Sequence, residues 1–173
     1  MADREPVDIR NLDRYGNAPL EWSRSLDALG NSARSNITFF LATCGPDGIP
    51  HTAGVGAMWD DVDLYFVSGP GTRKSRNLAA NAACTLSVHL EGIDLVLEGT
   101  AARVVDPATL ERLAARYRTT GWPVHVEGDA FVAPYSAPSA GPPPWHLYRL
   151  ALRTVSGVAT AEPHGATRWT FAG

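Results

Sequence analysis

The stretch FFLATCGPDGIPHTAGVGAMWDDVDLYFVS (39–68) decides the fold. It belongs to a β-branched and aromatic run, NITFFLATC (36–44), that ends at the turn sequence GPDG, where glycine supplies the backbone angles of a tight turn. A second strand-like run follows at 49–59, and a third at 62–68 shows a strict two-residue alternation. Three such runs at short spacing predict an antiparallel meander.

The remaining chain supplies more strands and a few helices. Further strand-like runs lie at 84–90, 93–105, 145–152, 154–160 and 166–171. Helical spacing predicts helices at 20–30, ending on Gly30, around 73–81, and at 106–121. We therefore expect a mainly β (α+β) fold with flanking helices, either a barrel or a sandwich, and we favour an antiparallel barrel because its closure removes exposed strand edges.

The helix at 106–121 has the clearest signals. Asp106 is placed to cap it, Pro107 suits its first turn, and Gly121 is placed to end it. Its buried face is expected to consist of Leu110, Leu113, Ala114 and Tyr117.

Length and composition indicate one soluble domain spanning 1–173. Hydrophobic residues make up 45% and charged residues 19%, which is typical of a globular protein, and the formal charge of −3 argues against nucleic acid as a partner. No apolar run approaches the roughly 20 residues of a membrane span, so we expect a cytoplasmic protein without a membrane contact. Residues 1–20 resemble a loosely ordered arm, and 122–144 form a Pro/Gly-rich loop. Cys44 and Cys84 are expected to be buried free thiols.

A cationic loop, GPGTRKSRNL (69–78), is the main candidate site. Thr72 is a suitable N-cap for a helix that begins at Arg73, and the free first-turn N–H groups with Arg73, Lys74 and Arg76 favour an anion. The loop alone is equally consistent with a solvated helix face. It is not a Walker A loop, because no glycine precedes the KS pair as that motif requires.

The succession from 39 to 88 resembles the flavin-binding split β-barrel family related to pyridoxamine 5′-phosphate oxidase, and is most similar to its actinobacterial branch that uses FMN or coenzyme F420. The shared features are a strand, a glycine turn, a P-H-x strand, an L-Y-F strand and T-R-K-x-R-N-L. The resemblance implies an antiparallel split β-barrel of the six-stranded type with flanking helices. It further implies a homodimer with cofactor sites between subunits and a small-molecule substrate. It also implies the cofactor-binding residues Thr52, Ala53, Gly54, Ser68, Gly69, Thr72, Arg73, Lys74, Asn77 and, with Arg168 beside it, Trp169 reaching the partner's site.

The chain departs from the family at its C-terminus, where ATRWTFAG (166–173) lacks the R-x-H pattern of pyridoxamine-oxidising members. Pyridoxamine phosphate is therefore not the expected substrate. We expect an FMN- or F420-dependent oxidoreductase, without a named catalytic side chain or metal, because the cofactor carries the chemistry. A non-catalytic flavin, deazaflavin or haem carrier or sensor is the alternative. His51 and Glu98 are each consistent with a site role or with a structural one.

Overall fold

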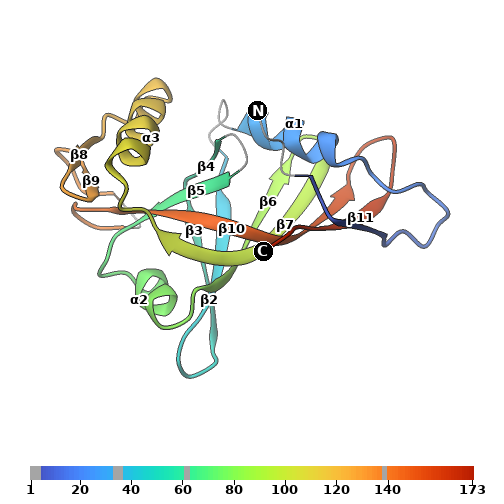
Figure 1. Ribbon diagram of the computed structural model, residues 1–173, viewed down its shortest axis with the longest axis horizontal. Helices are drawn as coiled ribbons and strands as arrows, with labels where there is room; N and C mark the ends of the chain where they lie inside the picture. The colour runs from blue at the N-terminus through green and yellow to red at the C-terminus, as the bar shows by residue number, and fades with distance from the viewer. Residues whose placement is uncertain (1–4, 33–36, 61–62, 138–139) are drawn as a thin grey trace.

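The computed structural model describes residues 5–32, 37–60, 63–137 and 140–173 (Figure 1). The helices are α1 (Trp22–Ser32), α2 (Arg73–Ala80) and α3 (Pro107–Thr119). The strands are β1 (Asp8–Asn11), β2 (Phe39–Cys44), β3 (Pro50–Val55), β4 (Ala57–Asp60), β5 (Asp63–Ser68), β6 (Ala83–Leu90), β7 (Ile93–Arg103), β8 (His125–Glu127), β9 (Ala130–Val132), β10 (His146–Ala159) and β11 (Ala166–Thr170). The mainly β class with flanking helices is confirmed. No helix in these ranges is both long and apolar enough to cross a membrane.

The strands form an antiparallel split barrel built around β10. The hydrogen-bonded order is β1-β11-β10-β7-β6-β2-β3, and the first half of β10 also pairs with β5, which pairs with β4. The two ends of the barrel path, β3 and β4, are successive strands joined at Gly56. The chain therefore links these two strands covalently at this point, without hydrogen bonds between them in the strand order.

Three details of the predicted strands were wrong. The run at 49–59 is two strands that break at Gly56, and β3 pairs with β2 whereas β4 pairs with β5, so the three runs are not a simple meander. The runs at 145–152 and 154–160 are one strand, β10, with a register shift between Leu152 and Thr154. A bulge of this kind bends a strand without ending it.

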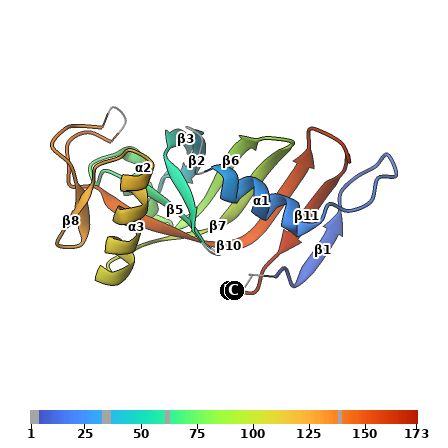
Figure 2. The same cartoon turned by 90° about the horizontal axis from the view of Figure 1, so that it is seen from above.

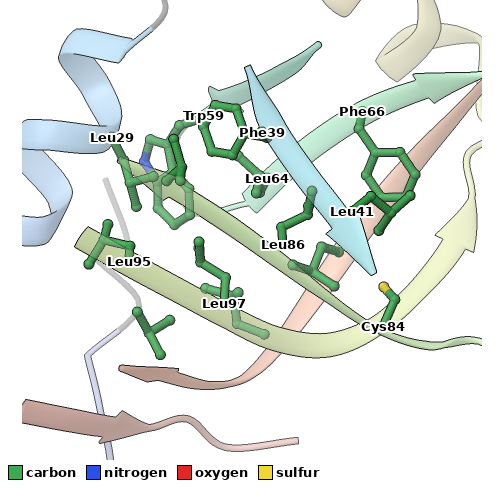
Figure 3. Close-up of a cluster of buried hydrophobic side chains, with 14 of the residues drawn as sticks. Leu29, Phe39, Leu41, Trp59, Leu64, Phe66, Cys84, Leu86, Leu95 and Leu97 are labelled. Carbon is green, nitrogen blue, oxygen red and sulfur yellow. The ribbon is translucent and has the colours of Figure 1, made fainter. Parts of the chain in front are cut away.

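The barrel interior is a continuous apolar core, shown in Figure 3. Leu41, Leu86 and Leu97 lie opposite one another on β2, β6 and β7 and are fully buried. Helix α1 contacts β4, β6 and β7 and adds Leu29 to this core (Figure 2). Both cysteines are free thiols, as predicted, but only Cys84 is buried, whereas Cys44 is half-buried. Burial raises the pKa of the Cys84 thiol to about 11.

Helix α3 and the hairpin of β8 and β9 form a second apolar core on the outside of the barrel. The capping prediction is confirmed, because the Asp106 side chain accepts a hydrogen bond of 2.8 Å from the backbone of Thr109. All four residues of the predicted helix face are buried. Part of the predicted loop at 122–144 is thus a short hairpin, which pairs through Phe131 with Trp145.

The N-terminal segment is more ordered than the sequence suggested. Strand β1 pairs with β11 at the edge of the sheet, and the backbone of Leu20 donates a buried 2.7 Å hydrogen bond to the Thr167 hydroxyl. Helix α1 also continues past Gly30 to Ser32. Glycine ends a helix when it adopts a positive φ, and Gly30 is not among the glycines that do so.

Gly157 is expected to be essential for the packing of β10 on β11. A Cβ at this position would lie 2.8 Å from the indole of Trp169, which is fully buried. We expect Gly157→Ala to lower the free energy of unfolding by about 1–3 kcal/mol, measured by urea denaturation. The control is Gly30→Ala, which has open space around the new methyl group and should stabilise α1 by about 0.5–1 kcal/mol. Equal stability of the two variants would contradict the packing argument.

Candidate functional site

The N-terminus of α2 is held by a cluster of hydroxyl groups. The Thr72 side chain caps the helix by accepting from the backbone of Ser75, which confirms the predicted N-cap. Its own hydroxyl donates to the carbonyl of Gly69 at 2.9 Å. The fully buried Ser68 hydroxyl lies 3.0 Å from the Thr72 hydroxyl and 2.7 Å from that of Ser75. This network fixes the end of β5 against the first turn of α2.

The three cations of the loop differ in their surroundings. Arg73 is exposed, and Arg76 donates to the carbonyl of Gly71 at 2.5 Å. Lys74 is the single lysine of the whole sequence and is only 4% exposed. Burial disfavours the ammonium form and lowers the pKa of Lys74. An anion bound beside Lys74 would offset this desolvation.

The single lysine allows the pKa of Lys74 to be measured directly. Protein labelled with ¹³Cε-lysine is expected to give one lysine signal that titrates below the usual value of 10.5. The unfolded chain retains its proton to about 10.5, so the stability lost by burying this charge should be regained as pH rises from the folded pKa toward that value. A folded-state pKa at or above 10.5 would show that an anionic partner outweighs the desolvation.

Two predicted site residues of this region have structural partners of their own. Asn77 is buried, and its amide donates a 3.0 Å hydrogen bond to the Thr43 hydroxyl on β2. Gly69 is buried beneath Ala140, since a Cβ on Gly69 would lie 2.2 Å from the carbonyl oxygen of that residue. The segment that begins at Ala140 therefore packs on the loop that leads from β5 into α2.

Strand β3 runs beside α2. Thr52 is exposed, while Ala53 and Gly54 are half-buried. Gly54 lies opposite Phe40 of β2, and Phe40 is 51% exposed. The structure thus places the predicted residues of β3 and α2 on neighbouring elements that contact each other.

A recess of about 190 Å³ lies where these elements meet the outer core. Gly54 and Lys74 both line it, so two of the predicted residues share one cavity. The rest of the lining was not predicted and includes Val67 of β5, Tyr117 of α3, Trp122 and Trp145. Burial raises the pKa of the Tyr117 phenol, so this residue is neutral. The aromatic residues that follow α3 in the sequence were the signal from which this part of the lining could have been predicted.

Trp169 lies apart from the other predicted site residues. Its indole is fully buried and packs on Trp22 of α1 with a ring-centroid distance of 5.3 Å. In this chain the large aromatic is part of the core, and its contact with a partner's cofactor stays a prediction. Arg168 is exposed on β11 and donates to the Ser156 hydroxyl at 3.2 Å.

His51 and Glu98, for which the sequence allowed either a site role or a structural one, are not among the residues that line the recess. His51 is half-buried on β3, at a position opposite Thr43. Glu98 on β7 accepts a 2.6 Å hydrogen bond from the Thr154 hydroxyl at the bulge of β10. The contact of Glu98 is a structural one between adjacent strands.

An ion-pair cluster connects α3 to the barrel. Asp60, the last residue of β4, has 3% of its side chain exposed and pairs with both Arg112 and Arg116 of α3. The two arginine side chains are 45% and 42% exposed. A buried carboxylate requires such partners. The cluster therefore holds in place the helix that contributes Tyr117 to the recess.

The strand order and the recess together define an antiparallel split β-barrel protein. The sequence profile described as "Pyridoxamine 5′-phosphate oxidase" matches residues 28–165. The protein therefore belongs to the pyridoxamine 5′-phosphate oxidase family, which confirms the resemblance seen in the sequence. A search of curated protein sequences returned no match.

Solved structures share this fold at low sequence identity. An F420 reductase is 24% identical, with a TM-score of 0.50 over 75% of this chain and 94% of that chain. A putative pyridoxamine 5′-phosphate oxidase from Listeria innocua is 16% identical, with a TM-score of 0.55 over 78% and 96%. PhzG from Burkholderia lata 383, in complex with tetrahydrophenazine-1-carboxylic acid, is 16% identical, with a TM-score of 0.55 over 88% and 84%. At these identities the likeness concerns the fold.

Proposed function

We propose that this protein binds FMN or coenzyme F420 and transfers a hydride between the cofactor and a small organic substrate. The observation that carries the proposal is the placement of Lys74, the single lysine of the chain, in the first turn of α2 and in the wall of the recess. A cation that is 4% exposed beside a helix N-terminus is suited to an anionic ligand. Family membership and the F420 reductase neighbour support this class of cofactor.

The residues present fit a phosphate-bearing ring. Arg73 and the first-turn N–H groups of α2 would hold the phosphate, with Lys74 beneath them. The ring would lie along Thr52–Gly54, where the small side chains of Ala53 and Gly54 leave room for a flat group. When bound, the cofactor supplies the hydride chemistry. The protein positions it and excludes water.

The absence of an R-x-H pattern from ATRWTFAG (166–173) argues against pyridoxamine phosphate as the substrate. Membership of the family does not identify the substrate, because proteins that share one fold act on many different substrates. We therefore expect steady turnover of another small substrate when a reduced cofactor is supplied. Tight cofactor binding without turnover of any acceptor would instead favour the carrier or sensor.

The cofactor test is a parallel titration of the purified apoprotein with FMN and F420, followed by fluorescence quenching. Micromolar or tighter binding of one of them is the expected result and identifies the redox class. The phosphodiester and acidic tail of F420 favour a longer basic track than the terminal phosphate of FMN needs. A salt titration therefore helps to distinguish the two cofactors. The affinity of the cofactor that makes more ionic contacts should fall more steeply as the salt concentration rises. Failure of both cofactors to bind would overturn the proposal.

The second half of the proposal is a homodimer that completes the cofactor site. The recess of about 190 Å³ is smaller than the roughly 300–1,000 Å³ of common ligand pockets, so one protomer encloses only part of a cofactor. Phe40 on β2 and Val96 on β7 lie in line across the sheet, separated by Ser87 of β6, and are 51% and 39% exposed. An apolar sheet face next to Gly54 is a suitable interface for a second copy.

The dimer is tested by light scattering after size-exclusion chromatography. Phe40→Glu combined with Val96→Glu is expected to convert a dimer to a monomer and to weaken cofactor binding. Val105→Glu is the matched control, because Val105 is 57% exposed and lies after β7, away from this line of residues. A parent protein that is monomeric at micromolar concentration would refute the interface.

A further inference from the structure

Strand β1 leaves one edge of the sheet open. It ends the hydrogen-bonded strand order, and β11 is its one neighbour among the described strands. Figure 2 shows β1 on the outer side of β11, and all four residues of β1 are exposed. An unpaired strand edge is a template for pairing with another strand. This edge is therefore a candidate interaction surface, separate from the recess at α2.

The register of β1 on β11 decides which backbone groups point to the open edge. The N–H group of Leu12 donates to the carbonyl of Ala166 at 2.8 Å. Hydrogen-bonded and non-hydrogen-bonded pairs alternate along an antiparallel ladder, so Arg10 is the next residue whose N–H and C=O groups face β11. Those of Ile9 and Asn11 then point to the open edge. They are available to a second strand.

The charges on β1 lack a partner within the protomer. Arg10 lies directly opposite Arg168 of β11, and both side chains are exposed. Like charges directly opposite each other destabilise a ladder. Among the described residues, neither arginine forms an ion pair with a carboxylate, and Asp8 forms none with a cation. A carboxylate from another chain, placed beside Arg10, would reduce the repulsion.

The order of charges along β1 is self-complementary, because Asp8 and Arg10 flank Ile9. When a second β1 strand lies antiparallel with the two Ile9 residues opposite each other, Asp8 of each strand lies opposite Arg10 of the other. These two pairs are of the non-hydrogen-bonded type, whose Cα atoms are about 4.5 Å apart, so their side chains meet. A parallel arrangement would place like charges side by side. The sequence thus favours an antiparallel second copy of the same strand.

We propose that β1 is a self-association surface, which binds β1 of a second copy of this chain about a two-fold axis at Ile9. The Ile9 N–H and C=O groups would bond with those of the partner's Ile9, and the Asn11 N–H group would donate to the carbonyl of the partner's Val7. Ile9 is 53% exposed, and its side chain would pack on its symmetry mate. The two-fold symmetry closes the contact, so it joins two sheets without propagating. It rests on β1 alone, and neither on the cofactor nor on the sheet face at Phe40.

The expected affinity of this contact is low. One short strand edge buries far less surface than the roughly 1,200 Å² of a standard interface, so we expect a Kd of about 0.1 mM. At the micromolar concentrations that test the sheet-face dimer, the β1 contact is mostly dissociated. At higher concentration it would join two sheet-face dimers, or two protomers where that dimer does not form.

Charge reversal tests the pairing in the full-length protein. Asp8→Arg and Arg10→Asp each place like charges opposite one another at two positions, so each variant should self-associate at least tenfold more weakly than the parent. The double variant restores two opposite-charge pairs and should self-associate at least tenfold more tightly than either single variant. A mixture of the two single variants also carries opposite charges at both positions, so the two chains should bind each other.

Sedimentation velocity from micromolar to millimolar protein measures the association. Arg153→Asp, which reverses an exposed charge on β10, is the matched control and should behave like the parent. The series is repeated with Phe40→Glu and Val96→Glu present, where the β1 contact should remain even though the sheet-face contact is lost. A parent that shows no association up to millimolar concentration would overturn the proposal, as would equal association of the parent and both single variants.

Amide hydrogen exchange locates the contact. The amides of Ile9 and Asn11 should become protected as the protein concentration rises, whereas the amide of Arg10, which faces β11, should not change. Ile9→Pro removes the central donor and should abolish the association, while an edge strand tolerates proline where the N–H group faces solvent. The thermal unfolding midpoint verifies that each variant is folded. Association without added protection at Ile9 and Asn11 would place the contact elsewhere and refute pairing through β1.

Discussion

Replacing Arg73 by alanine together with Lys74 by methionine is expected to weaken cofactor binding at least a hundredfold. Each residue would make a charge-assisted hydrogen bond to the phosphate, and such bonds contribute about 1.5–3 kcal/mol each. Two of them correspond to at least two orders of magnitude in Kd. Methionine preserves the apolar stem of the buried Lys74, so the fold should be retained. The measurement is a fluorescence titration with FMN and F420.

The matched control is Arg153→Ala, which removes an exposed arginine on β10. This variant should bind the cofactor like the parent protein. The single variants divide the effect between the exposed Arg73 and the buried Lys74. Unchanged affinity in the folded double variant would remove the N-terminus of α2 from the proposed cofactor site.

Removing both arginines that face Asp60 is expected to cause the largest loss of stability. Arg112→Met with Arg116→Met leaves a carboxylate with 3% exposure and neither of its two partners. Breaking a buried ion pair from one side costs about 3–5 kcal/mol. We expect about 3 kcal/mol, since the partly exposed arginines are screened by water. Urea denaturation of the double variant measures this loss.

Adding Asp60→Asn to the double variant tests the cause. If the loss arises from an unpaired buried charge, the triple variant should recover at least half of it, because the amide is neutral. A triple variant as unstable as the double would indicate that the arginine stems, through their packing, account for the effect.

Local signals in the sequence predicted the elements more reliably than their boundaries. Asp106 and Pro107 specify the start of α3, and Thr72 specifies that of α2, because caps act within one turn. The helix end predicted at Gly30 was wrong because glycine permits a helix to end but does not require it. The break at Gly56 was missed because β3 and β4 read as one β-rich run, although they pair with different strands.

The candidate site could be predicted only in part. The residues of β3 and of the cationic loop were identified from short motifs. The wall containing Val67, Tyr117 and Trp122 depends on the docking of α3 against β5, which no local pattern specifies. The burial of Lys74 was hidden for the same reason, since a run of three cations is typical of a solvated surface. The burial of Trp169 in the core was likewise not predicted from the sequence.

The path of the chain between β7 and β10 affects how the sequences of related proteins can differ. Strand β7 ends at Arg103, β10 begins at His146, and Arg103 lies opposite Tyr148. The segment 104–145, which carries α3 and the β8–β9 hairpin, thus leaves and rejoins the barrel at adjacent points. A change in the length of this segment therefore need not alter the register of the barrel strands. Grafting this segment between relatives should therefore exchange ligand preference and leave the residues of β3 and α2 untouched.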